Sequence, residues 1–191
     1  MAVVHPILGE NCTLTTFNAG RSTRVPEFEG HNVHIDARIP VARFEDTFQV
    51  LVMICIDDFT EANGSTYVWP GSHTSGVNPK TQGLTEYPPG RVAIEAPKGS
   101  VFLFLSQLWH DVGTNISGDR RWGVTAYYSA WWVKPYCEFT LCGPEIFSML
   151  STEQKVLMGF NSLPPRPFIS KRMTTCFPAD KIPSRYEDAL K

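Results

Sequence analysis

The chain has 191 residues, of which 42% are hydrophobic and 19% are charged, and its formal net charge is −2. This length and composition suit one globular domain with a buried core and exclude extensive disorder. The small negative charge gives no electrostatic basis for nucleic acid or an anionic membrane as a partner. No apolar run approaches the ~20 residues that a membrane-spanning helix needs.

The cysteines indicate a cellular compartment. Five are present, an odd number, and no two of them are spaced as Cys-x-x-Cys. This usage supports neither a disulfide framework nor a structural zinc site, and reduced thiols are the simplest interpretation. Because the residues after Met1 also lack the pattern of a signal peptide, the sequence predicts a cytoplasmic protein.

Several short segments carry the residue pattern of β-strands. The strongest is residues 48–56, a continuous run rich in Val and Ile, which indicates a strand buried on both faces. In chain order the segments are residues 12–18, 48–56, 66–69, 92–96, 101–105 and 122–132. Pro97 and Gly99 lie between the fourth and fifth segments and predict a hairpin there.

Other parts of the chain lack a strand pattern. Residues 74–91 contain Gly, Pro and Asn without a clear period, and we expect a loop that borders a pocket mouth as a lid. Pro144 predicts the start of a short helix that runs to Leu150. Ser151 begins a second predicted helix, which ends at about Met158.

The order of these elements predicts a fold class. Short strands separated by turns, with helix only towards the end, indicate a mainly all-β fold, and a jelly roll suits it best. We expect one domain over residues 1–160. Residues 161–191 are rich in Pro and basic side chains and predict a C-terminal tail that packs on this domain or extends from it.

The tripeptide His34-Ile35-Asp36 points to a metal site. Residues i and i+2 of an extended segment project to the same side, so an imidazole and a carboxylate can face one position in space. A second imidazole from a distant strand would complete the two-histidine, one-carboxylate set of non-haem Fe(II) oxygenases. His110, expected at the end of the strand over residues 101–105, is the candidate. Taken alone, the tripeptide also suits a polar pair at a strand end, and His110 suits a core histidine.

The motifs occur in an order that resembles the phytanoyl-CoA dioxygenase family, and the resemblance extends to about Gly159. The features that carry it are the His34-x-Asp36 pair, residues 63–73 (NGSTYVWPGSH), residues 99–104 (GSVFLF), His110 with Arg121, and residues 132–135 (WVKP). The family consists of Fe(II)- and 2-oxoglutarate-dependent oxygenases with a double-stranded β-helix, a cupin-like jelly roll. The resemblance implies this fold here, and the helical patterns add short C-terminal helices.

The resemblance also implies roles for single residues. Arg121 matches the arginine that binds the distal carboxylate of 2-oxoglutarate, and its planar, permanently charged guanidinium suits that task. Thr66 lies where some members place a hydroxyl against the cosubstrate, and Asn32 where some place a side-chain amide. The residues that match the three iron ligands are His34, Asp36 and His110.

These roles imply an enzyme. A dioxygenase of this kind uses Fe(II), O2 and 2-oxoglutarate to hydroxylate or otherwise oxidise a C–H bond of a small organic substrate, with release of succinate and CO2. Asp36 argues against a halogenase, because those relatives carry a small residue at this place. Two alternatives stay open: a jelly-roll binding or assembly protein without catalysis, and a cupin-type metalloenzyme that does not use 2-oxoglutarate.

The chain departs from the family pattern at its start. Members usually carry roughly a hundred further residues before the first strand, and these back the β-helix. Here Met1 lies close to the segment Ile7-Leu8-Gly9 that normally follows them. Without backing strands a sheet edge or an apolar face would stay open, so we expect self-association through that edge.

Overall fold

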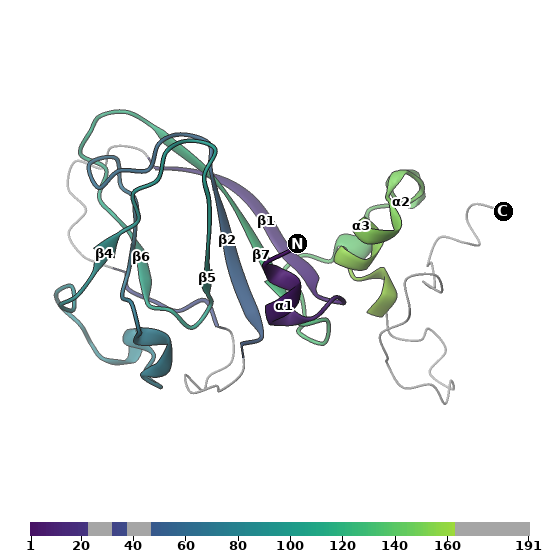
Figure 1. Cartoon of the computed structure of the whole chain (residues 1–191), viewed down its shortest axis with the longest axis horizontal. Helices are drawn as coiled ribbons and strands as arrows, with labels where there is room; N and C mark the ends of the chain where they lie inside the picture. Colours follow the sequence, from purple (N-terminus) through teal and green to yellow (C-terminus); the bar gives the residue numbers. More distant parts are fainter. Residues whose placement is uncertain (23–31, 38–46, 163–191) are drawn as a thin grey trace. The chain divides into compact units, whose positions relative to one another are not determined.

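The computed structural model of the chain describes residues 1–22, 32–37 and 47–162 (Figure 1). Its contacts divide the chain into two compact units. The first unit comprises Met1–Thr16 and Tyr127–Lys191, and the second unit comprises Phe17–Ala126. Two strands, β1 (Thr13–Ser22) and β7 (Arg121–Ser129), contribute residues to both units.

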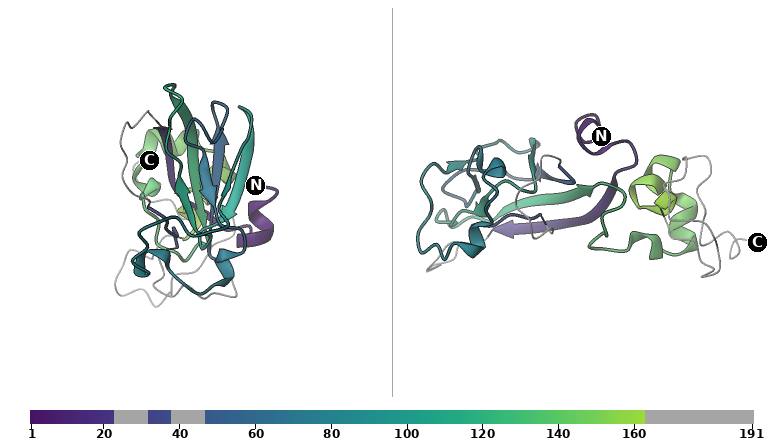
Figure 2. Two further views of the ribbon diagram at one scale, coloured as in Figure 1. Left: turned by 90° about the vertical axis from the view of Figure 1, so that its left-hand side faces the viewer. Right: turned by 90° about the horizontal axis from the view of Figure 1, so that it is seen from below.

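Two β-sheets build the second unit. The four-stranded sheet has the order β1-β7-β2-β5, and the three-stranded sheet has the order β4-β3-β6. The remaining strands are β2 (Gln49–Cys55), β3 (Thr66–Val68), β4 (Val92–Ala93), β5 (Val101–Leu105) and β6 (His110–Val112). Within this unit the two sheets lie next to each other (Figures 1 and 2), and the ring centroids of Phe104 on β5 and His110 on β6 are 4.9 Å apart.

Strand β2 confirms the central strand predicted from the Val- and Ile-rich run. Val50 and Leu51 are adjacent and both buried, so both faces of the strand are covered where it begins. The strand pairs with β5 in antiparallel register, which places Leu51 opposite Phe104. Because directly opposed residues share a face of the sheet, Leu51 lies on the face that contacts His110.

The predicted hairpin between residues 92–96 and 101–105 is wrong. Strand β4 pairs with β3 in one sheet, whereas β5 pairs with β2 in the other. The turn between them is held from outside, because the Gly99 N–H donates to the Cys55 carbonyl oxygen at 2.7 Å. A strand pattern identifies a strand but not its partner, and here the chain passes from one sheet to the other.

His110 also lies on a different element from the one predicted. It begins β6, which pairs with β3 in the three-stranded sheet, and does not end the strand over residues 101–105. The chain turns between these strands, where the Leu108 N–H donates to the Leu105 carbonyl oxygen at 2.9 Å. The turn carries His110 across to the facing sheet.

The segment 74–91 is anchored by two tryptophans. The Trp69 indole N–H donates to the Pro88 carbonyl oxygen and the Trp109 indole N–H donates to the Val77 carbonyl oxygen, both at 2.9 Å. Short 3-10 turns, Ser72–Thr74 and Pro79–Thr81, give it local structure. That this segment acts as a lid stays a prediction.

The described part of the first unit holds the helices. They are α1 (Val4–Leu8), α2 (Pro144–Met149) and α3 (Thr152–Leu157). The two predicted C-terminal helices are confirmed, and α3 starts with a capping box in which Ser151 and Gln154 exchange hydrogen bonds. The prediction of one domain over residues 1–160 stays a prediction, and of the tail over residues 161–191 all but the first two residues lie outside the described part of the chain.

Two further expectations concern surfaces. Among the helices of the described residues, none combines the length and the apolar character that crossing a bilayer requires. Strand β5 ends the four-stranded sheet at one side, and the side chain of its first residue, Val101, is exposed. Self-association through such an edge stays a prediction.

Candidate functional site

Within residues 1–22, 32–37 and 47–162, a single cluster of three potential metal ligands was found. It consists of His34, Asp36 and His110, whose ligand atoms all lie within 4.8 Å of one another. Asp36 Oδ1 is 3.6 Å from His34 Nε2, and Asp36 Oδ2 is 3.2 Å from His110 Nε2. One carboxylate therefore meets both imidazoles, and the three side chains face a common position. We call this cluster the metal group.

Backbone hydrogen bonds bring the metal group together. His34 and His110 form an isolated antiparallel bridge, in which each N–H donates to the other residue's carbonyl oxygen at 3.0 Å. The Asp36 N–H donates to the Ser106 carbonyl oxygen at 2.9 Å. The extended segment 32–37 thus runs alongside β6 and the residues before it, and the two imidazole centroids are 4.2 Å apart.

The two imidazoles are oriented by main-chain carbonyls. His34 Nδ1 lies 2.7 Å from the Asn32 carbonyl oxygen, and His110 Nδ1 lies 2.9 Å from the Leu108 carbonyl oxygen. A carbonyl oxygen only accepts, so each Nδ1 carries the proton and each neutral ring keeps its lone pair on Nε2. Nε2 is the atom that faces Asp36. A histidine whose other nitrogen donates to a carbonyl is typical of metal-binding sites.

The electrostatics of the metal group favour a cation. Burial alone would lower the pKa of His34, but the hydrogen bonds with the Asp36 carboxylate and the Asn32 carbonyl oxygen, together with the charge of Asp36, outweigh it. The pKa of His34 is therefore raised, although Lys80 opposes this through its positive charge. The negative potential that favours a proton at this position favours a metal cation in the same way.

Arg121 is an enclosed cation at the start of β7. Its side chain is buried, one Nη donates to the Gly64 carbonyl oxygen, and its guanidinium carbon lies 4.0 Å from the centroid of the Phe59 ring. Burial lowers the pKa of Arg121, and the opposing effects of the nearby Cys55 and Asp57 only partly offset this decrease. In the described part of the chain its Nε has no hydrogen-bond partner. A buried cation with an unsatisfied donor suits a bound anion.

A row of phenylalanine rings connects Arg121 with the metal group. The centroid distances are 5.8 Å from Phe59 to Phe102, 6.4 Å from Phe102 to Phe104, and 4.9 Å from Phe104 to His110. Gly123 lies against this phenylalanine row, and a Cβ built on it would lie 2.8 Å from Phe59 Cζ. The side chains that link the metal group to Arg121 are therefore apolar rings.

The two further residues predicted at the site differ in what they contribute. Thr66 is buried, and the register sets it opposite Val112 while Val68 is opposite His110, so its side chain shares the face of His110. Asn32 contributes its backbone: its N–H donates to Asp111 Oδ2 at 2.7 Å and its carbonyl oxygen meets His34 Nδ1. That Thr66 and the Asn32 amide contact a cosubstrate stays a prediction.

Two residues near the metal group were not predicted. Asp111 is buried beside His110 and points to the opposite face of β6, and the Tyr87 hydroxyl donates a hydrogen bond to its carboxylate. The alternation along β6 would have placed Asp111 once that strand was known. Tyr87 lies in the loop segment 74–91, where no periodic pattern indicates which residues turn inward.

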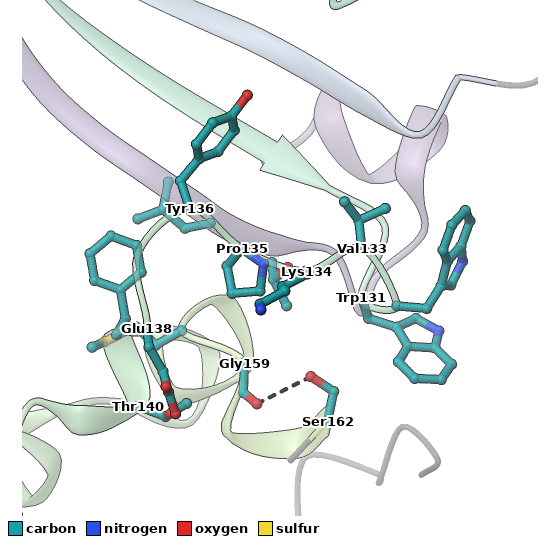
Figure 3. Close-up of a pocket in the computed structure, with 14 residues that line it drawn as sticks. Trp131, Val133, Lys134, Pro135, Tyr136, Glu138, Thr140, Gly159 and Ser162 are labelled. Carbon is teal, nitrogen blue, oxygen red and sulfur yellow. Dashed lines mark hydrogen bonds between the residues drawn. The ribbon is translucent and has the colours of Figure 1, made fainter. Parts of the chain in front are cut away.

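A separate cavity of about 720 Å³ lies in the first unit (Figure 3). Its lining is largely apolar and aromatic, with Trp131, Trp132 and Tyr136 on one stretch of chain and the charged side chains Lys134 and Glu138 among them. None of the residues that the sequence predicts for the site lines it. The chemistry-bearing side chains and this cavity thus belong to different units of the chain.

A family model supports the resemblance that the order of the motifs indicates. The model for "Phytanoyl-CoA dioxygenase (PhyH)" matches residues 3–123. This range contains His34, Asp36, His110 and Arg121.

Curated proteins with similar sequences cover most of this chain. "Uncharacterized protein Rv1501" of Mycobacterium tuberculosis and "Uncharacterized protein Mb1539" of Mycobacterium bovis are each 28% identical over 142 residues, 73% of this chain and 51% of theirs. "Dioxygenase af480" of Aspergillus fumigatus is 27% identical over 161 residues, 82% of this chain and 50% of its own. The chain spans about half the length of the curated proteins it matches.

Solved structures share the fold. The "Non-heme monooxygenase, ThoJ-Ni complex" aligns with a TM-score of 0.54 at 19% identity and covers 72% of this chain and 52% of that one. The "non-heme alpha ketoglutarate dependent epimerase SnoN from nogalamycin biosynthesis" aligns with a TM-score of 0.52 at 20% identity and covers 68% of this chain and 51% of that one. At these identities the likeness concerns the fold alone, and it confirms the predicted double-stranded β-helix. Together with the family match over residues 3–123, it leads to one conclusion: the chain belongs to the phytanoyl-CoA dioxygenase family.

Proposed function

We propose that the protein is an Fe(II)- and 2-oxoglutarate-dependent dioxygenase that oxidises a C–H bond of a small organic molecule. The observation that carries the proposal is the metal group, in which two Nε2 atoms and one carboxylate face a common position. Two imidazoles and a carboxylate with an open opposite side form the ligand set that non-haem Fe(II) oxygenases use.

The donor set fits iron. His34 and His110 are the nitrogen ligands, because their Nδ1 atoms are engaged by carbonyl oxygens and their Nε2 atoms are directed at Asp36. Asp36 is the oxygen ligand and supplies the negative charge. The raised pKa of His34 supports this assignment, because it reports a position where positive charge is stabilised.

The interior also fits 2-oxoglutarate. Arg121 has a buried guanidinium whose Nε lacks a partner among the described residues, and a carboxylate accepting from it would satisfy that donor. Its second contact, the ring of Phe59, leaves the cation enclosed and little screened by water. Thr66 shares the face of His110 and is the proposed second contact to the cosubstrate, and the Asn32 amide is a third.

Bound iron and 2-oxoglutarate would supply the activation of dioxygen that oxidation of an aliphatic C–H bond requires, with succinate and CO2 as products. The chain's own residues hold and orient these groups. The three metal-group side chains fix the cation, Arg121 fixes the end of the dicarboxylate, and the phenylalanine row keeps water away from the space between them.

Hydroxylation is the proposed outcome. Asp36 provides the carboxylate ligand that a halide would have to replace, so the chain is not proposed as a halogenase. Solved proteins of the same fold carry the names monooxygenase and epimerase, so the fold accommodates more than one outcome on small molecules. The proposed partner is a small organic substrate, without nucleic acid or membrane, and the proposed location is the cytoplasm.

The test is turnover of 2-oxoglutarate. The purified chain is incubated with Fe(II), 2-oxoglutarate, O2 and a metabolite extract, and succinate is measured by mass spectrometry against the same mixture without O2. Oxygen-dependent succinate that is lost in Arg121→Ala supports the proposal. Oxygen-dependent oxidation of a metabolite that forms no succinate and survives Arg121→Ala would instead identify a cupin-type metalloenzyme. Tight metal binding without any succinate would identify a binding protein.

A further inference from the structure

The Asp111 carboxylate joins three parts of the second unit. It is 5% exposed, and its two oxygens accept backbone N–H donors at 2.7 Å each, Oδ2 from Asn32 and Oδ1 from Val112. A buried carboxylate is retained only when its oxygens are well satisfied, and charge-assisted bonds of this length are among the stronger ones. Asp111 is therefore a fixed point to which the Asn32 backbone is tied.

Asn32 transmits this restraint to the metal group. The same residue that donates its N–H to Asp111 offers its carbonyl oxygen to His34 Nδ1, at 2.7 Å. The two backbone groups flank one α-carbon, so a displacement of the N–H side rotates or shifts the carbonyl that orients the imidazole. Hydrogen-bond partners of this outer kind typically tune metal affinity by about 10–100-fold.

Tyr87 ties Asp111 to the segment 74–91. The Tyr87 hydroxyl donates to the Asp111 carboxylate, and burial together with that negative charge and hydrogen bond raises the pKa of Tyr87 to about 12. Its ring lies 5.8 Å from the Tyr67 ring and 5.9 Å from the Trp69 ring. The ring is thus held in one orientation with its hydroxyl on Asp111.

Arg91 links Tyr87 to strand β3. Its guanidinium carbon lies 4.3 Å from the Tyr67 ring centroid and 4.4 Å from that of Tyr87, so it contacts both rings. Tyr67 belongs to β3 and Tyr87 to the segment, and the cation binds the two together. Tyr87, Asp111, Asn32 and His34 form a continuous chain of hydrogen bonds.

We propose that Asp111 is a positioning residue, which couples the packing of the segment 74–91, through Tyr87, to the orientation of the His34 imidazole. The proposal rests on the metal-binding part of the proposed function and not on the oxidation itself. Coupling of this kind is reciprocal. Metal binding should therefore tighten the segment, and loosening the segment should weaken metal binding.

Co²⁺ binding tests the coupling without turnover. Its affinity is measured by titration calorimetry for the full chain and for Tyr87→Phe, which removes one hydroxyl remote from the metal group. The expected loss is about threefold to tenfold for Tyr87→Phe and about 10–100-fold for Asp111→Asn. Tyr136→Phe is the matched control, since it removes a phenol hydroxyl in the other unit, and it should leave the affinity unchanged.

Two further measurements separate positioning from mere support of the fold. Hydrogen exchange of residues 74–91 should slow on Co²⁺ binding in the wild type and respond much less in Tyr87→Phe. In the double variant Tyr87→Phe/Asp111→Asn the affinity should match Asp111→Asn alone, because both act through one hydrogen-bonded path.

A lowered melting temperature of Tyr87→Phe with unchanged Co²⁺ affinity would overturn the proposal, and so would additive losses in the double variant. Because Tyr87→Phe removes only a hydroxyl, this test stands even where Asp111→Asn does not fold. Intact coupling to Co²⁺ in a protein that never forms succinate would refute the oxygenase and leave this inference standing.

Discussion

The metal group and the Arg121 region belong to the same unit but are held in different ways. His34 and His110 are oriented by main-chain carbonyls and by a main-chain bridge. Arg121 instead depends on the ring of Phe59 and on one carbonyl oxygen, that of Gly64. Main-chain partners follow from the course of the chain, whereas side-chain partners change with every substitution. The metal group should therefore tolerate changes nearby better than Arg121 does, except where a side chain fixes one of those main-chain partners, as Asp111 does for Asn32.

Asp36→Ala should have the largest effect on the metal group. It removes the carboxylate that meets both Nε2 atoms, and loss of a ligand should exceed the about 10–100-fold cost that is typical of losing an outer partner. We expect metal affinity in calorimetry to fall by at least about a hundredfold while the melting temperature changes little. Asp119→Ala, which removes an exposed carboxylate, is the control. Unchanged affinity in Asp36→Ala would exclude this metal site.

Arg121→Ala should weaken 2-oxoglutarate binding and spare the metal. Two charge-assisted hydrogen bonds, each worth about 1.5–3 kcal/mol, correspond to about a hundredfold or more in affinity. Arg121→Lys should recover only part of the 2-oxoglutarate affinity, because an ammonium group lacks the planar fork of the guanidinium. Arg120→Ala is the control, since Arg120 is exposed while Arg121 is buried. Equal losses from the two alanine variants would contradict the assignment.

Gly64→Ala should disturb the Arg121 region through the backbone. Gly64 has φ +79°, and a Cβ on it would lie 2.6 Å from the Gly113 carbonyl oxygen, so strain and overlap should cost about 2 kcal/mol in the free energy of unfolding. A Cβ on Gly20 would have no neighbour within 4 Å, so Gly20→Ala should change the free energy of unfolding by no more than about 0.5 kcal/mol. Denaturant unfolding measures both. A Gly64→Ala protein as stable as Gly20→Ala would show that the contact is relieved cheaply.

Thr66→Val should give the smallest effect. It keeps the shape of the side chain and removes one hydroxyl on the face of His110, and a single neutral hydrogen bond of about 0.5–1.5 kcal/mol corresponds to roughly threefold to tenfold in affinity. The dissociation constant of 2-oxoglutarate is the measurement. Thr125→Val on β7 is the matched control. A loss as large as that of Arg121→Ala would move the principal cosubstrate contact to Thr66.

Local pattern predicted the elements that packing does not decide. The Val- and Ile-rich run became β2, and Ser151 with Gln154 became the capping box of α3, because both signals depend on neighbours in sequence. The five-residue helix α1 was not predicted, since it has no side-chain cap and too few residues for a period. The partner strands of β4 and β5 were also out of reach, because sheet partners are chosen by the whole fold.

The candidate site shows the same difference between residues that local pattern predicts and residues that it does not. His34 and Asp36 follow from the two-residue period of an extended segment, and the family resemblance supplied His110 and Arg121. The same two-residue period allows only one of the neighbours Arg120 and Arg121 to turn inward, and Arg121 is the buried one. Tyr87 could not be predicted, because its contact with Asp111 depends on how a loop without period folds back.

The glycine beside the phenylalanine row restricts how this protein can change over generations. A Cβ at Gly123 would press on Phe59 Cζ at 2.8 Å and on Met53 Sδ at 3.1 Å. Met53 is flexible and can retreat, whereas Phe59 supports the guanidinium of Arg121. A lineage that needed a roomier or narrower interior could therefore vary position 53 first. Position 123 would stay closed to larger residues for as long as Phe59 supports Arg121, because a change at position 53 leaves the 2.8 Å contact with Phe59 in place.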